Sequence, residues 1–241
     1  MNVAFVSWCL ALALLSLGGC AQTATTYQLH YDINNPERQT FQNTLLIFPA
    51  DIATQELFPG GVIEDIPSWT SATNEIITKQ LEIYLASRLG IHSKILRDNS
   101  NSSLVHNHTV LLKWVNRAIR KHTRGWNTWT HKQNRFDYTI GPGLNFLRNQ
   151  DVDTALYITG AQMVQVAKFD DTLTDITSYP SNQLTFGQIH FDICLVDLDT
   201  GDILWSNIDN YTGVDLRQTR SIRKMLAYAL KSFPVSIFGR E

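Results

Sequence analysis

The chain has 241 residues, of which 44% are hydrophobic and 17% charged, and its formal net charge is −2. This composition is typical of a globular protein and excludes an intrinsically disordered chain. The length suffices for one sizeable hydrophobic core, or for one core with an insertion.

The amino-terminal stretch is an apolar run at residues 3–15, followed by Leu-Gly-Gly-Cys at residues 17–20. An apolar run of about a dozen residues is too short to span a bilayer, which takes roughly 20, and suits a signal-peptide core. The ending resembles the lipobox of bacterial lipoproteins, although no Lys or Arg precedes the apolar run. The resemblance implies that residues 1–19 are a removed signal peptide and that Cys20 is lipidated. Because Ala21 rather than Asp follows, it also implies sorting to the outer membrane, facing the periplasm.

Two alternatives remain for this stretch: an ordinary secretory leader in which Cys20 carries no lipid, and a buried apolar helix. The other cysteines are Cys9, inside the leader, and Cys194. No intramolecular disulfide is possible if Cys20 is acylated. Cys194 alternates within an apolar strand pattern, which favours a small buried side chain over a nucleophile. No second apolar stretch approaches membrane-spanning length.

The first part of the mature chain is polar. Residues 20–42 are rich in Thr, Gln and Asn and are predicted to form a lipidated tether to a domain spanning 43–238. The apolar run at 44–48 predicts a buried strand, which Pro49 ends. Residues 51–67, with Pro-Gly-Gly inside, are expected to form a loop.

A helix is predicted next. Ser68 can cap it, apolar side chains then recur at steps of three and four residues, and Gly90 closes it. A short strand is expected around residues 94–96, followed by a polar loop at 99–103.

The following segment is basic. From Asn99 to Phe136 there is no Asp or Glu, whereas the rest of the chain holds 13 basic residues (20 less seven) against 22 acidic ones, a balance of −9. A helical stripe predicts an amphipathic helix here. The inward positions are expected to be Leu104, Val105, His108, Leu111, Leu112, Val115 and Ile119.

The basic segment, residues 113–135, is the main candidate binding surface. The candidate contacts to an anionic surface are Lys113, Arg117, Arg120, Lys121 and Arg124, beside Trp114, Trp126 and Trp129. Such residues suit lipid phosphates, lipopolysaccharide or an acidic partner protein. The alternative is a solvated helix face with tryptophans in the core. A nucleic-acid partner is not expected for an exported lipoprotein.

The last third of the chain carries the clearest pattern. A short helix is expected at 142–147, a strand at 154–166 and an acidic loop at 168–183. Alternation from Ile189 to Val196, a turn ending in Gly201 and a second run through Trp205 predict a β-hairpin.

The chain closes with a helix. Asp215 followed three residues later by Gln218 resembles a capping box, and a helix then runs to a stop at Pro234. These elements together predict an α/β fold: a single domain with a mixed β-sheet covered by helices and a C-terminal β-hairpin followed by a helix.

Several short segments resemble a group of exported bacterial lipoproteins with no established biochemical role. The matching segments are Leu45–Pro49, Pro67–Thr70, Arg135–Pro142, Asp153–Tyr157 and Leu195–Trp205. The hairpin and final helix are remotely similar to the periplasmic α/β domains of curli-secretion, exopolysaccharide-export and penicillin-binding-protein activator lipoproteins. The resemblance implies a domain that acts by binding or assembly, and it transfers no catalytic residues.

Two clusters contain residue types that can bind metal ions. His106 and His108 would face one way only on a strand, and their surroundings predict a helix that turns the rings about 200° apart. Asp197, Asp199 and Asp202 are better explained as turn residues that accept backbone hydrogen bonds than as a calcium site. We therefore expect no metal and no cofactor.

The sequence thus predicts a non-enzymatic outer-membrane lipoprotein whose periplasmic domain binds a protein or an envelope polymer, attached to the membrane through its lipid. The alternative is a metal-dependent or other envelope hydrolase that uses His106, His108 and acidic residues.

Overall fold

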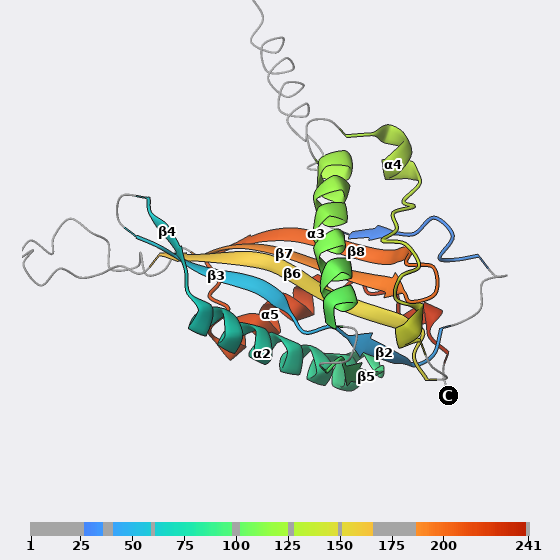
Figure 1. Ribbon diagram of the computed structural model, residues 1–241, viewed down its shortest axis with the longest axis horizontal. Coiled ribbons are helices and arrows are strands. Elements are labelled where there is room, and N and C mark those ends of the chain that lie inside the picture. Colours follow the sequence, from blue (N-terminus) through green and yellow to red (C-terminus); the bar gives the residue numbers. More distant parts are fainter. Residues whose placement is uncertain are drawn as a thin grey trace, which may run out of the picture.

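The computed structural model describes residues 27–35, 41–58, 61–97, 102–124, 128–148, 151–165 and 187–239. In these ranges eight strands form one mixed sheet with helices on both faces, so the predicted α/β class is confirmed (Figure 1). The strands are β1 (Tyr27–Leu29), β2 (Thr44–Ile47), β3 (Asp51–Leu57), β4 (Ile63–Asp65), β5 (His92–Ile95), β6 (Thr154–Gln165), β7 (Gly187–Asp197) and β8 (Ile203–Thr212). The helices are α2 (Pro67–Tyr84), α3 (Ser102–Arg124), α4 (Thr130–Asn134) and α5 (Thr219–Ala229), with single helical turns at Leu85–Leu89, Asn145–Leu147 and Val235–Ile237.

The sheet is built around the long strands β6, β7 and β8, which pair antiparallel in that order. The β7–β8 connection is the predicted hairpin, and Gly201 holds the expected positive φ of 75°. An added Cβ at Gly201 would lie 2.0 Å from the carbonyl oxygen of Gly141, so the close approach of two backbones also requires glycine.

The other side of β6 is covered by two strands in succession. β2 pairs parallel with its first residues and β3 with the rest, from Asp51 opposite Thr159 to Leu57 opposite Gln165. Pro49 separates β2 from β3, as expected of a residue without an N–H group. The loop predicted over 51–67 is therefore wrong. Most of it forms β3 and β4, because alternate β3 residues such as Ile52 and Thr54 are buried.

The domain also begins earlier than residue 43. β1 pairs antiparallel with β8, with Tyr27 opposite Asn207, and Phe41 is buried beside Phe238. The tether predicted over 20–42 is thus too long, because Tyr27, Leu29, Ile33 and Phe41 pack on the core of the domain. Residues 1–26, including Cys20 and the predicted signal peptide, lie outside the described part of the chain.

One face of the sheet is closed by α2 and α5. Their inward residues, including Ile77 and Leu81 from α2 and Ile222 and Leu226 from α5, share a core with the sheet residues Ile52, Phe191 and Trp205. α2 begins at Pro67 after Ile66, with no side-chain cap, so the cap predicted at Ser68 is wrong. Gly90 ends this helical stretch at φ 68°, as predicted.

The capping box predicted before the last helix is also wrong. α5 starts at Thr219 after Gln218, without a side-chain cap, and Asp215 instead receives hydrogen bonds from Arg217. The helix ends at Ala229, before Pro234. The side chain of Arg217 extends over the ring of Trp69, with its guanidinium carbon 4.4 Å from the centroid, and so links the regions around both helix starts.

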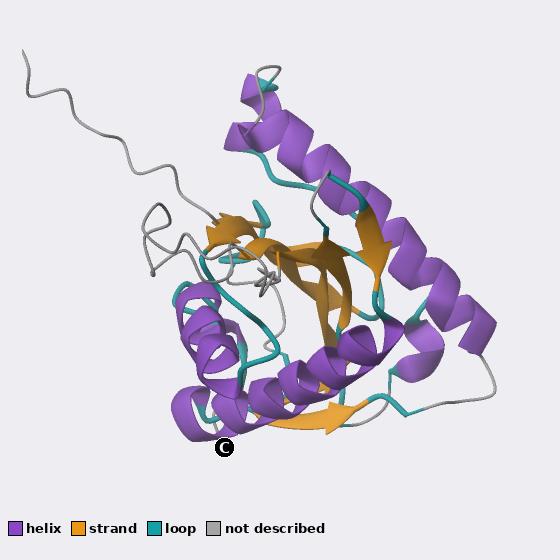
Figure 2. Cartoon of the chain, turned by 90° about the vertical axis from the view of Figure 1, so that its left-hand side faces the viewer, coloured by secondary structure: helices purple, strands orange, loops and turns teal. Residues whose placement is uncertain are grey.

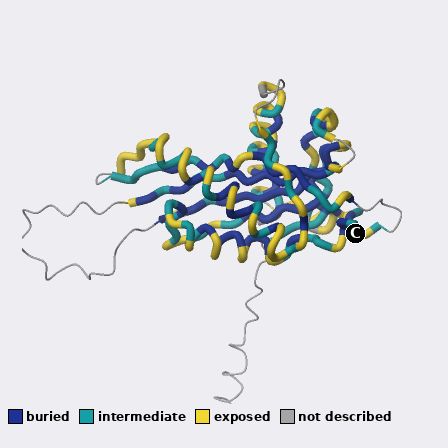
Figure 3. Tube along the Cα trace, turned by 90° about the horizontal axis from the view of Figure 1, so that it is seen from below, coloured by how far each residue is buried: buried dark blue, intermediate teal, exposed yellow. Residues whose placement is uncertain are grey.

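The opposite face carries α3 and the segment that follows it. Figure 2 shows helices on both sides of the strands, and Figure 3 shows buried residues concentrated along the middle of the sheet. Leu112 and Ile119 of α3 share a second core with Phe136, Tyr157 and Ile203. This face positions the basic residues predicted from the sequence.

Candidate functional site

Helix α3 contacts the sheet through one face. Its buried positions are His108, Leu112, Asn116, Ile119 and Thr123. Their spacing of three and four residues places them on one side of an α-helix. Three of the five are polar, which is unusual for the inward face of an amphipathic helix.

The outward side of α3 carries large apolar residues instead. The exposed fractions are 38% for Leu104, 38% for Val110, 42% for Leu111 and 61% for Trp114. The prediction that Leu104 and Leu111 face inward is therefore wrong, and so is the alternative that placed this tryptophan in the core. We call these four residues together with Arg117 and Lys121 the outer face of α3.

The sheet beneath α3 explains why polar residues lie on the inward side of this helix. Asn116 is 1% exposed and lies near Thr159, while the thiol of Cys194 donates to its side-chain oxygen at 3.2 Å. Ser206 on the next strand lies 3.5 Å from the same sulfur atom. A polar patch of this kind is satisfied by a polar helix face, so asparagine rather than leucine points inward.

Cys194 is fully buried in this contact, and its burial raises the pKa of the thiol to about 12. A thiol with so high a pKa is a poor nucleophile, in agreement with the predicted structural role.

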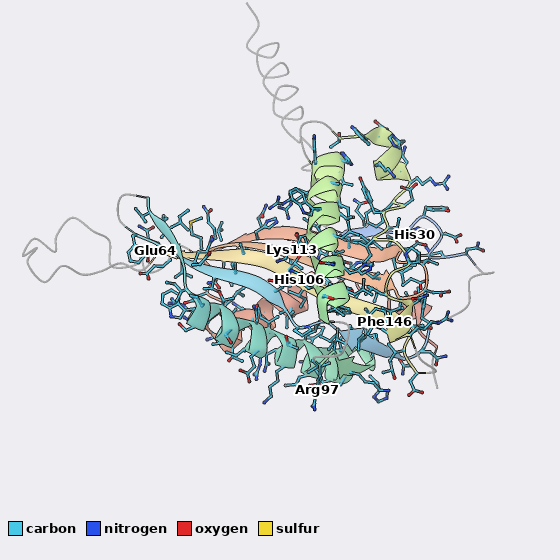
Figure 4. All side chains as sticks on the ribbon, viewed as in Figure 1. His30, Glu64, Arg97, His106, Lys113 and Phe146 are labelled. Carbon is cyan, nitrogen blue, oxygen red and sulfur yellow. The ribbon has the colours of Figure 1, made fainter. Side chains whose placement is uncertain are left out.

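Two of the predicted surface cations hold α3 to the sheet. Arg120 donates to Asp192 at 2.7 Å, and the Asp192 side chain is only 8% exposed. Lys113 pairs with Asp51 at 2.5 Å, in a position where both side chains are nearly half exposed. Figure 4 shows Lys113 and His106 on α3, in front of the strands. Arg120 and Lys113 therefore fix the helix and are partly neutralised by sheet carboxylates.

The two outward cations are Arg117 and Lys121, both exposed. Neither forms an ion pair with any described residue. The guanidinium carbon of Arg117 lies 4.6 Å from the ring centroid of Trp114, a cation–π arrangement. The side chain of Arg124 and all of Trp126 lie outside the described part of the chain, so those two predictions remain untested.

An aromatic cluster lies at the carboxyl end of α3. The rings of His122 and Trp129 stack with centroids 3.8 Å apart, and Trp129 is 47% exposed. His122 Nδ1 is 2.8 Å from the hydroxyl oxygen of Tyr138, and the Trp129 N–H donates to the His122 carbonyl oxygen. Burial, followed by the charges of Lys121 and Lys132, lowers the pKa of His122, which favours the neutral form of this ring.

The chain enters the domain close to this cluster. The N–H of Tyr31, two residues after β1, donates to the carbonyl oxygen of Phe136 at 2.9 Å. The guanidinium carbon of Arg135 lies 4.1 Å from the Tyr31 ring centroid. Phe136 in turn packs near Tyr138, with ring centroids 5.3 Å apart. The amino-terminal end of the domain and the carboxyl end of α3 are therefore neighbours.

The two histidines of the pair lie on different sides of α3. The pair lies in this helix, as predicted, where His106 is exposed and His108 is 9% exposed beside Gly143. Burial lowers the pKa of His108. Within the described residues no group of three or more His, Cys, Asp or Glu side chains is arranged to hold a metal ion.

In the acidic turn after β7, an aspartate accepts a backbone hydrogen bond, as predicted from the sequence. Asp197 Oδ1 accepts the backbone N–H of Asp199 at 2.8 Å, and Asp199 pairs with Arg148 at 3.1 Å. The aspartates thus stabilise the hairpin turn.

A shallow hollow between the end of β8 and α5 was not foreseen from the sequence. It encloses about 490 Å³, and Tyr211 and Tyr228 stand edge to face in its wall. The polar lining residues are Asp209, Asn210, Ser221 and Lys224.

The described fold is a three-layer α/β domain with an open mixed sheet and one helix that exposes apolar and basic residues. In this part of the chain, no helix is both long and apolar enough to cross a membrane.

Neither a known protein family nor a curated protein matches this sequence. The solved PelC dodecamer from Paraburkholderia phytofirmans is similar: it is 14% identical, covers 77% of this chain and 87% of its own, and has a TM-score of 0.28. A single-residue variant of that protein is 12% identical, with 78% and 88% covered and a TM-score of 0.30. At TM-scores this low, the likeness supports no conclusion about the function or assembly of this chain.

Proposed function

We propose that this chain is a lipid-anchored protein of the bacterial outer membrane whose periplasmic domain acts by binding or assembly, not by catalysis. The outer face of α3 is the observation that carries the binding role. Four large apolar side chains exposed on one helix are costly to keep in water and are typical of an interaction surface. The sequence motif around Cys20 supports the anchor.

The alternative, a metal-dependent hydrolase, has less support. It would use His106 and His108, but these rings lie on different sides of α3, one exposed and one buried. Purified protein assayed for bound metal discriminates between the two functions. A stoichiometric metal that is lost in a His106→Ala variant would favour the hydrolase.

The anchor is tested by metabolic labelling with radioactive palmitate. The wild-type chain and a Cys9→Ser control should both be labelled and recovered with outer-membrane fractions. The Cys20→Ser variant should be unlabelled. Continued labelling of Cys20→Ser would contradict the lipoprotein assignment.

The binding role is tested by placing a photo-crosslinking amino acid at position 114 in intact cells. The matched control is position 83, because Ile83 is 46% exposed on α2, which covers the opposite face of the sheet. A binding domain should give adducts, to protein, lipid or polymer, that are specific to position 114. Equal adducts from both positions, or none, would contradict a dedicated surface on α3.

A further inference from the structure

The outer face of α3 combines apolar and basic side chains in one narrow sector. At 100° per residue, Arg117, Val110, Lys121, Trp114, Leu111 and Leu104 follow one another within about 140° of the helix circumference. An amphipathic helix that lies on a membrane surface has this composition, with tryptophan and leucine at the level of the acyl boundary and cations near the phosphates.

The charges on this face favour an anionic partner. No Asp or Glu occurs between Asn99 and Phe136, and the two sheet carboxylates near α3, Asp51 and Asp192, are paired with Lys113 and Arg120. The rest of the chain has a balance of −9, so a negatively charged surface attracts α3 and repels the remainder. Charge complementarity therefore orients the domain with α3 toward such a surface.

The length of chain before the domain points to a membrane as that surface. Seven peptide steps separate Cys20 from Tyr27, so the start of β1 lies at most about 25 Å from a lipid on Cys20. Tyr31, just after β1, contacts Arg135 and Phe136, which lead through Tyr138 to His122 on α3. A lipid anchor would thus hold the aromatic cluster and the end of α3 close to the bilayer.

We infer that the outer face of α3 docks on an anionic phospholipid bilayer, with Trp114 and Leu111 at the interface and Arg117 and Lys121 against headgroup phosphates. This inference rests on the proposed function and names its binding partner. A bilayer accounts for both halves of the surface, since it offers phosphates to the cations and an acyl boundary to the exposed leucines and tryptophan. An amphipathic basic surface is a known mode of membrane binding, and beside a lipid anchor it would fix the orientation of the domain on the bilayer.

The test uses the unlipidated polypeptide from residue 21, which retains every described helix and strand. It is floated with vesicles of one part phosphatidylglycerol to three parts phosphatidylethanolamine, and with neutral phosphatidylcholine vesicles. Binding should occur to the anionic vesicles alone and weaken as salt rises. Each cation contributes about a fivefold factor near an anionic surface, so Arg117→Glu with Lys121→Glu should lower the partition coefficient about 25-fold or more.

Matched variants distinguish binding through the outer face of α3 from a general effect of net charge or of exposed apolar area. Lys79→Glu with Arg88→Glu changes net charge equally on the opposite layer, where both side chains are exposed, and it should leave at least half of the binding. Trp114→Ala should weaken binding about tenfold, whereas Tyr228→Ala, 55% exposed on α5, should not. Circular dichroism checks that each variant is folded.

Three outcomes would overturn the inference: no binding to anionic vesicles, equal loss in the two charge-reversal variants, or binding to a soluble acidic protein or polysaccharide instead. These outcomes are independent of the palmitate experiment. If Cys20 is labelled while the vesicles are not bound, the lipoprotein assignment stands and docking of α3 fails.

Discussion

The two faces of the sheet are covered in opposite ways. On one face, α2 and α5 bury apolar residues such as Ile77 and Leu226 against Phe191 and Trp205. On the other, α3 buries Asn116 against Cys194 and exposes Trp114. The first arrangement stabilises the fold by removing apolar area from water. The second arrangement buries less apolar area and so stabilises the fold less, and it leaves apolar area exposed where a partner can bind.

This difference indicates that the two helical layers have different roles. The α2–α5 layer supplies a core that needs no partner, while α3 is held by Leu112 and Ile119 together with polar contacts and ion pairs, and it also exposes apolar side chains to the exterior. A helix attached through polar contacts specifies its position through their geometry, because each misplaced buried group loses its hydrogen bond. The comparison can be tested by making the same chemical change on both faces.

The largest expected contrast is between two tryptophans. Trp205 is fully buried and packs edge to face against Phe233, with centroids 5.3 Å apart. Trp205→Ala should lower the free energy of unfolding by about 3–5 kcal/mol. Trp114→Ala, at a 61% exposed position, should change it by less than about 0.5 kcal/mol. Urea denaturation followed by circular dichroism measures both, and equal losses would mean that α3 is not the open layer.

The next contrast is between two carboxylates that hold α3. Asp192→Asn leaves the partly buried Arg120 without its counter-charge and should cost about 2–3 kcal/mol. Asp51→Asn removes a pair whose side chains are 42% and 44% exposed and should cost less than about 1 kcal/mol. Urea denaturation followed by circular dichroism measures the loss of unfolding free energy in both variants, and equal losses would contradict this contrast.

The rate of alkylation of Cys194 gives a second measure of how firmly Asp192 holds α3 on the sheet. In the polypeptide from residue 21, Cys194 is the single cysteine, and α3 covers it. Asp192→Asn should therefore increase alkylation of Cys194 in native buffer through local opening of α3. An unchanged rate would show that α3 does not open separately from the rest of the domain.

The smallest expected effect concerns pH. Burial holds the pKa of His108 below its usual value of about 6.5. The unfolded chain then binds more protons near and below pH 6.5, so the contribution of His108 to stability is fully present above this pH and is lost as pH decreases through the folded pKa. His108→Gln should make that fall shallower, with a residual slope from His122. His106→Gln, at an exposed position, is the control, and an identical change in both variants would contradict the assignment.

The sequence predicted the elements whose pattern is local. The alternation from Ile189 to Val196 and the positive φ required at Gly201 identify the β7–β8 hairpin without knowledge of its neighbours. The helical spacing in α2 and α5 likewise identifies helices that pack on an apolar core. Their exact starts were missed, because Ser68 and Asp215 make no cap.

The sequence failed where the outcome depends on distant partners. The Pro-Gly-Gly segment predicts a loop where β3 lies, because the partner strand β6 comes about 100 residues later and leaves no local sign. The helical stripe correctly predicts the inward side of α3 for Val105, His108, Leu112, Val115 and Ile119, and it is wrong for Leu104 and Leu111, which are exposed. The position of Cys194 and Ser206 on the sheet explains why Asn116 also lies on the inward side of α3. The stacking of Trp129 on His122 is likewise a tertiary contact with no local pattern.

The edge pairing of β1 has a consequence for the order in which the chain folds. Tyr27 pairs opposite Asn207, and Phe41 bridges to Phe238, so both contacts join residues separated by more than two thirds of the 241-residue chain. As the polypeptide emerges, its first strand has no place to bind until the last strand has followed. Contacts of such high sequence separation slow folding. In the meantime the apolar segments of β6 and β7 are exposed, which makes the emerging chain prone to aggregation.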